Sequence, residues 1–133
     1  MNKKYKLTVT EKQANVIRKA LEIYSRIGLG QFVEILYHPQ WWLNVNDTEK
    51  VHKDIDNLIK SVCGFENSNM SYGIYSEEVD DTCRVAYDIE QVIRHRISWD
   101  NNPEGGFTVN FGKPMKTSKK EELPKIEENK EEN

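Results

Sequence analysis

The sequence predicts an α+β fold in which three helices pack on a small antiparallel sheet. Two short stretches, at residues 4–10 and 107–111, alternate apolar and polar residues as half-buried strands do. Three segments between them repeat apolar residues at helical spacing. Two strands are marginal by themselves, so we expect the helices to cover the sheet. A chain of 133 residues fits one domain.

The two predicted strands each place three apolar side chains on one face. In the first strand these are Tyr5, Leu7 and Val9, and in the second they are Phe107, Val109 and Phe111. Because one strand begins the folded body and the other ends it, we expect them to be adjacent and antiparallel.

The first predicted helix begins at Thr10, where Gln13 completes a capping box. The Gly28-Leu29-Gly30 segment interrupts its pattern, and we expect a break or kink there because each interior glycine costs about 1 kcal/mol. A close-packing glycine in a longer helix is the alternative. A phosphate-binding loop is disfavoured because no strand precedes these glycines.

Two more helices follow. One runs from Asn46 or Asp47 to Cys63 and stops at Gly64, and the other runs from Asp80 or Asp81 to about Trp99. The stretch between them, residues 65–79, is predicted to be a packed irregular loop. The carboxylates at its end suit helix capping rather than a metal site.

The last segment, residues 113–133, has a different composition from the body, residues 1–112. It holds six Lys, six Glu and few large apolar residues. Such a segment buries too little apolar surface to offset its ordering entropy, so we expect a mobile, solubilising tail. A docking strip around residues 123–126 is the alternative.

Composition excludes several functional classes. The net charge of −3 makes nucleic acid an unlikely partner. No apolar run is long enough to cross a membrane, and no signal peptide is recognisable, so we expect a cytoplasmic protein. Cys63 and Cys83 are expected to be reduced thiols. No zinc-site spacing is present, and we predict neither a metal nor a cofactor.

The third predicted helix carries the candidate ligand site. Arg96 falls within its apolar stripe, four residues before Asp100, where it either forms an ion pair or lines an anion pocket. A loop rich in Tyr, Ser and Gly, residues 71–76, is a candidate second wall. The predicted ligand-binding residues are Arg96, Arg94, Tyr72, Tyr75, Trp99 and Asp100.

The opposite face of that helix is a candidate docking surface. Tyr87, Gln91 and Arg94 have the composition of binding hot spots, although an ordinary solvated face is equally consistent. The adjacent Trp41 and Trp42 are candidates for stacking on a base or a partner side chain.

Two segments, residues 24–32 (YSRIGLGQF) and 86–96 (AYDIEQVIRHR), resemble small uncharacterised proteins of bacteriophages and prophages. The resemblance covers most of the body. It carries no catalytic residue over to this chain, but it implies a setting. Small phage accessory proteins often counter host defence by binding a host protein or by sequestering a signalling nucleotide.

The leading hypothesis is therefore a non-enzymatic, homo-oligomeric protein that captures a small anionic, nucleotide-like ligand. An inhibitor or adaptor that docks onto a host protein is the alternative. An enzyme with His95 as general base and Asp100 assisting ranks last, because no nucleophile or metal set is evident.

Overall fold

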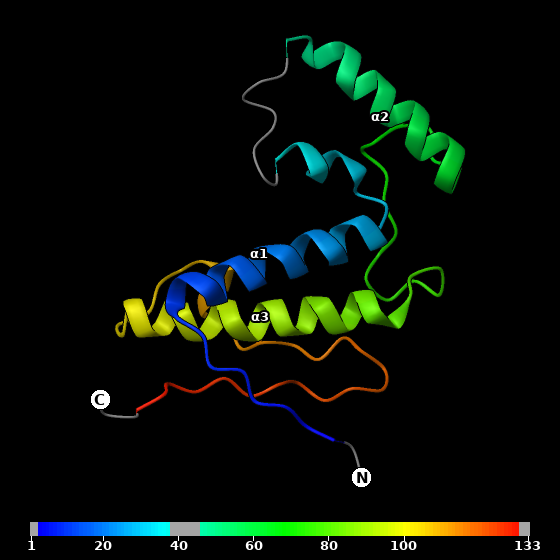
Figure 1. Ribbon diagram of the computed structural model, residues 1–133. Helices are drawn as coiled ribbons and strands as arrows, with labels where there is room; N and C mark the ends of the chain where they lie inside the picture. Colours follow the sequence, from blue (N-terminus) through cyan, green and yellow to red (C-terminus); the bar gives the residue numbers. More distant parts are fainter. Residues whose placement is uncertain (1–2, 38–45, 131–133) are drawn as a thin grey trace.

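The computed structural model describes residues 3–37 and 46–130. Its elements are α1 (Glu11–Gly28), the 3-10 helix η1 (Phe32–Leu36), α2 (Thr48–Cys63), α3 (Asp81–Asn101) and the 3-10 helix η3 (Val109–Phe111). The helices α1 and α3 lie side by side and antiparallel, and α2 stands apart from α3 on the far side of η1 (Figure 1). None of the described helices is long and apolar enough to cross a membrane.

Local sequence signals set the helix ends, and these predictions are confirmed. The Thr10 hydroxyl accepts from the backbone N–H of Gln13, and the Gln13 side chain accepts from that of Thr10, which is the expected capping box. Asp47 caps α2 and Asp80 caps α3. Gly64 ends α2 in the left-handed conformation, with a φ of 77°.

Gly28 has two roles at the end of α1. The helix ends at this residue, as expected, and the chain turns away through Gly30, whose φ is 86°. Gly28 also lies against α3 so closely that an added Cβ would overlap the Sγ atom of Cys83. Cys83 and Cys63 are both free thiols, and burial raises the pKa of Cys83 above its ordinary value.

The predicted sheet is wrong: no strand forms in the part of the chain that the structure describes, and the fold is helical rather than α+β. Residues 3–9 are exposed, and their backbone forms no hydrogen bond with another described residue. The other predicted strand bends into η3, where the indole N–H of Trp99 donates to the carbonyl of Phe111 at 3.1 Å. The alternating pattern is present at residues 3–9, but the segment expected to pair with it packs against the C-terminal part of α3 instead.

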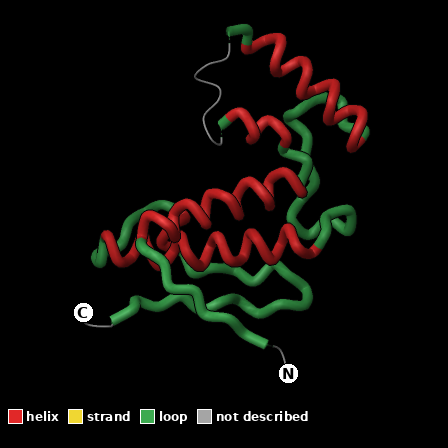
Figure 2. The backbone as a smooth tube through the Cα atoms, viewed as in Figure 1, coloured by secondary structure: helices red, strands yellow, loops and turns green. Residues whose placement is uncertain are grey.

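Part of the segment after residue 112, which was predicted to be a mobile tail, is held against α3. Residues 115–119, called the strap below, run along α3 in an extended conformation (Figure 2). Thr117 and Ser118 are buried although both are polar. The composition argument failed because it counted only apolar surface, whereas hydrogen bonds from α3 hold this segment.

Three side chains of α3 hold the strap by its backbone. Gln91 donates to the carbonyl of Met115 at 3.0 Å and accepts from its N–H at 3.2 Å. The Asp88 carboxylate accepts from the N–H groups of Thr117 and Ser118, both at 3.0 Å, and from the Thr117 hydroxyl at 2.6 Å. Asp81 accepts from the N–H of Lys119 at 3.0 Å, and this bond is the main reason that the pKa of Asp81 is lowered.

Arg84 fixes the loop that leads into α3. Its side chain is buried and donates to the carbonyls of Ile74, Ser76 and Val79 at 2.8, 3.2 and 2.9 Å. Its Nε–H donates to Asp81 at 2.9 Å. A buried guanidinium with this many acceptors is a structural group, because each donor needs a partner once water is removed.

Candidate functional site

The C-terminal end of α3 holds three of the predicted ligand-binding residues, and they are engaged with their neighbours. The Nε–H of Arg96 donates to both carboxylate oxygens of Asp100, at 3.0 and 3.1 Å. The two side chains are 37% and 50% exposed, so this is a surface ion pair. Trp99 and Phe111 pack their rings in a T-shaped arrangement, with centroids 5.4 Å apart. Of the two readings of Arg96, the structure shows the ion pair with Asp100.

Tyr72 and Tyr75 lie at the opposite end of α3. Tyr72 packs on Phe65, with ring centroids 4.8 Å apart, and its N–H donates to the carbonyl of Leu29. The loop that carries Tyr75 is held by Arg84, twelve residues before Arg96, which is about 18 Å along a helix. These tyrosines and Arg96 therefore do not share one pocket, contrary to expectation.

The predicted docking face is largely covered. Gln91 is buried and forms both of its hydrogen bonds with Met115 of the strap. Tyr87 is half-buried. A protein partner could reach Gln91 only after the strap had left α3. Trp41 and Trp42 lie outside the described residues.

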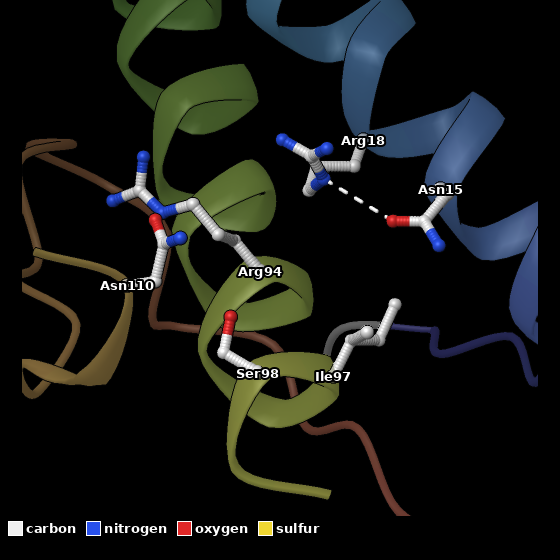
Figure 3. A pocket seen from close by; sticks show the side chains of 6 residues that line it. All are labelled: Asn15, Arg18, Arg94, Ile97, Ser98 and Asn110. Carbon is white, nitrogen blue, oxygen red and sulfur yellow. Dashed lines mark hydrogen bonds between the residues drawn. The ribbon is translucent and has the colours of Figure 1, made fainter. Parts of the chain in front are cut away.

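Arg94, one of the predicted residues, lines a hollow in the described part of the chain. The hollow has a volume of about 100 Å³ and opens between α1, α3 and η3. Asn15 and Arg18 lie together on α1, and Arg94 extends from α3 beside Asn110 (Figure 3). The six lining residues are Asn15, Arg18, Arg94, Ile97, Ser98 and Asn110.

The helix pair positions both arginines. Arg18 lies in the middle of α1 and Arg94 in the second half of α3, and the antiparallel packing of these helices brings them to the same level. The Nε–H of Arg18 donates to the Asn15 side chain at 3.5 Å, which holds both groups at the rim. Asn110 reaches the hollow because η3 folds back over the end of α3.

A buried carboxylate, Glu90, lies between the two arginines. It is 3.5 Å from the Nη1 atom of Arg18 and 3.4 Å from that of Arg94. Burial raises the pKa of Glu90, and the neighbouring Glu22 raises it further, while the two arginines lower it. Burial therefore destabilises the charged form of the Glu90 carboxylate, and the two guanidinium groups offset only part of that destabilisation.

The two arginines at the hollow have two carboxylate neighbours among the described residues, Glu90 and Glu22. Two guanidinium groups share Glu90, and the next carboxylate, Glu22, is 4.0 Å from Arg18 and closer to Arg26, at 3.1 Å. The Nε–H of Arg94 is buried and donates to no described group. An anionic group would add the missing acceptor, since guanidinium groups bind carboxylate and phosphate oxygens through several parallel hydrogen bonds.

The hollow is lined mainly by groups that form hydrogen bonds. Its polar side chains are two arginines, two asparagines and a serine. His95 does not line it and instead faces Trp99 at 6.4 Å between ring centroids. Among the described residues, no cluster of His, Cys, Asp and Glu could hold a metal ion.

A second hollow, of about 190 Å³, lies between η1 and residues 68–71. Its only charged lining residue is Glu34, so it lacks a group that would attract an anion. The hollow between α1 and α3 is therefore the stronger candidate.

Arg18, Asn15 and Asn110 were missed from the sequence. Arg18 stood four residues before Glu22, a spacing that usually marks a solvated ion pair on one helix. The signal that could have pointed to the site is Glu90, an acidic residue within a largely buried helix, because a buried carboxylate requires cations from another element.

Comparisons of the chain with protein-family models, with curated protein sequences and with solved structures give no match.

Proposed function

We propose that the protein is a non-enzymatic binding protein that holds the anionic group of a small, nucleotide-like ligand in the hollow between α1 and α3. The observation that carries the proposal is the meeting of Arg18 and Arg94, from different helices, at an open polar hollow with Glu90 as their shared counter-ion. Such a pair is a ready site for a phosphate or carboxylate group.

The size of the hollow limits what it can enclose. Pockets that bury a whole drug-sized ligand measure roughly 300–1,000 Å³, whereas this hollow measures about 100 Å³. It accommodates one anionic group, such as a phosphoryl group, while the remainder of the ligand stays outside. The recognised feature is therefore the anion.

The resemblance to phage proteins supplies a setting for this activity. In the cytoplasm of an infected bacterium, such a protein would sequester a signalling nucleotide that the host defence depends on. Docking onto a host protein ranks second, because the strap covers Gln91, the centre of the predicted docking face.

Calorimetric titration tests the proposal. The full chain is titrated with inorganic phosphate, with acetate, and with nucleoside mono- and diphosphates. We expect saturable binding that weakens about tenfold or more in Arg94→Ala and in Arg18→Ala, because each change removes hydrogen bonds to a charged group.

Arg96→Ala is the matched control. This substitution removes one positive charge from the helix that carries Arg94, but the Arg96 guanidinium pairs with Asp100 at the surface. An equal loss of affinity in all three variants would mean that only the net charge of the protein matters. That result would contradict a binding site at Arg18 and Arg94. Nucleotides that bind no more tightly than phosphate would contradict the nucleotide-like part of the proposal.

A further inference from the structure

The side chain of Asn110 lies at the hollow with its amide group unused. Asn110 belongs to η3 and lines the hollow together with Arg94, which lies beside it (Figure 3). Its carboxamide forms no hydrogen bond with another described residue. A side-chain amide carries two N–H donors, and hydrogen bonds from such donors to a charged acceptor are stronger than those between neutral groups.

The helix η3 is too short to hold this side chain in place by itself. Two backbone hydrogen bonds close it, from the N–H of Phe111 to the carbonyl of Thr108 and from the N–H of Gly112 to the carbonyl of Val109. Bonds of this type have poorer geometry than those of an α-helix, and short helices are marginal in water. The position of Asn110 therefore depends on contacts outside η3.

Trp99 supplies such contacts from α3. Its indole N–H donates to the carbonyl of Phe111, the residue after Asn110, at 3.1 Å. The rings of Trp99 and Phe111 also pack against each other, with centroids 5.4 Å apart. One side chain of α3 thus holds both the backbone and the ring of the residue next to Asn110.

The turn that leads into η3 packs on the same indole ring. Gly105 has a φ of 81°, and a Cβ atom at this position would approach the ring of Trp99 to 2.8 Å. A Cβ atom at Gly106 would approach the ring of Phe111 to 2.6 Å. Glycine permits this close approach because it has no side chain. Trp99 therefore contacts the chain both before and after Asn110.

We infer that Asn110 donates a hydrogen bond to the bound anion, and that Trp99 is the positioning residue that holds Asn110 at the hollow. The inference rests on the proposed function, because it concerns the same site. Trp99 is not among the residues that line the hollow. Its effect on binding therefore passes through η3, and Trp99 contributes without touching the anion.

A double-mutant cycle in the full chain tests this relation. Asn110→Ala removes the amide, whereas Trp99→Phe keeps an aromatic ring and removes the indole N–H. We expect Asn110→Ala to weaken phosphate binding about tenfold, as the loss of one hydrogen bond to a charged group does, and Trp99→Phe to weaken it less. Because Trp99 acts through Asn110, adding Trp99→Phe to Asn110→Ala should cause no further loss.

Phe107→Ala is the matched control within the same segment. The ring of Phe107 is fully exposed, so this substitution removes an aromatic side chain without disturbing the contact between Trp99 and Phe111. Its phosphate affinity should equal that of the wild type. Circular dichroism verifies that each variant keeps its helical content.

The NMR signal of the Trp99 indole N–H gives a readout that a purely structural role would not move. The chain has three tryptophans, and Trp99→Phe identifies the signal of this one. We expect phosphate to shift the signal in the wild type, with the same saturation as the binding measured by calorimetry. In Asn110→Ala, the shift at saturation should be much smaller.

The outcomes separate this inference from the proposed function. A wild type that binds no anion would contradict the proposed function and the inference with it. Phosphate binding that is unchanged in Asn110→Ala would overturn the inference and leave the arginine site standing. An undiminished effect of Trp99→Phe in the Asn110→Ala background would show that Trp99 does not act through Asn110, and would overturn its positioning role.

Discussion

At the residue scale, Glu90 links the candidate site to pH. Its raised pKa means that the folded chain takes up a proton more readily than the unfolded chain does. The stability associated with that proton is fully present below the ordinary pKa of glutamate and is lost as pH rises through the raised value. Protonation also frees Arg18 and Arg94 from their shared counter-ion.

Anion binding should therefore strengthen as pH falls through the pKa of Glu90. We expect Glu90→Gln to bind sulfate more tightly than the wild type at neutral pH and to show a flatter dependence of affinity on pH. Titration calorimetry with sulfate, whose charge is constant over this range, measures both. A wild-type pH dependence that is retained in Glu90→Gln would show that another group is responsible.

Gly28 offers a second prediction at this scale. A methyl group there would overlap the sulfur of Cys83, so α1 and α3 would have to separate. We expect Gly28→Ala to lower the free energy of unfolding by about 1–3 kcal/mol, the usual cost of overpacking. Urea unfolding measures it.

Gly73→Ala is the control for this prediction, because nothing lies within 4 Å of a Cβ at that position. Its stability should change little. Equal losses from the two substitutions would contradict the close-packing role of Gly28.

At the element scale, the strap depends on Asp88. This carboxylate accepts two backbone N–H groups and one hydroxyl, all from Thr117 and Ser118. We expect Asp88→Ala to destabilise the chain by about 2 kcal/mol or more, because buried donors lose a charged acceptor. Hydrogen exchange should show the amides of residues 115–119 losing protection while the centre of α1 keeps its own.

Asp100→Ala is the matched substitution, since it also removes a carboxylate from α3 but breaks only the exposed pair with Arg96. The strap amides should remain protected in this variant. A strap that stays protected in Asp88→Ala would mean that Gln91 and Asp81 suffice to hold it.

The sequence correctly predicted the helices but wrongly predicted that two strands would pair into a sheet. Helix ends were predictable because capping side chains and Gly64 act on backbone groups within a few residues. The strands were not, because a strand needs a partner, and the partner expected at residues 107–111 folds into η3 against α3 instead. An alternating pattern identifies a face to be buried without identifying what buries it.

The errors about the tail and about the polar face of α3 share one cause. Gln91 was interpretable as solvated, and the strap as free, only while the helix and the strap were considered separately. Their contacts join residues 24 to 30 positions apart. Local sequence patterns do not predict contacts between residues so far apart in the chain. Polar groups that hydrogen-bond to each other can be buried without any apolar residue in the pattern.

At the scale of the whole molecule, α1 and α3 form a packed pair, and α3 also contacts the strap and η3 (Figure 1). The anion site lies within this pair, so its two arginines are held by helices rather than loops. The N-terminal segment lies outside the pair. Leu7→Glu, a change in this exposed segment, should therefore leave phosphate affinity unchanged.

The most direct test of the anion site is nitrogen–hydrogen NMR spectroscopy of the arginine side chains during titration with phosphate. The chain has five arginines, so each Nε–H signal can be assigned by substitution. We predict saturable shifts for Arg94 and Arg18, while Arg84 and Arg96, which are engaged with Asp81 and Asp100, remain in place. Small, unsaturable shifts of equal size at every exposed arginine would contradict the site.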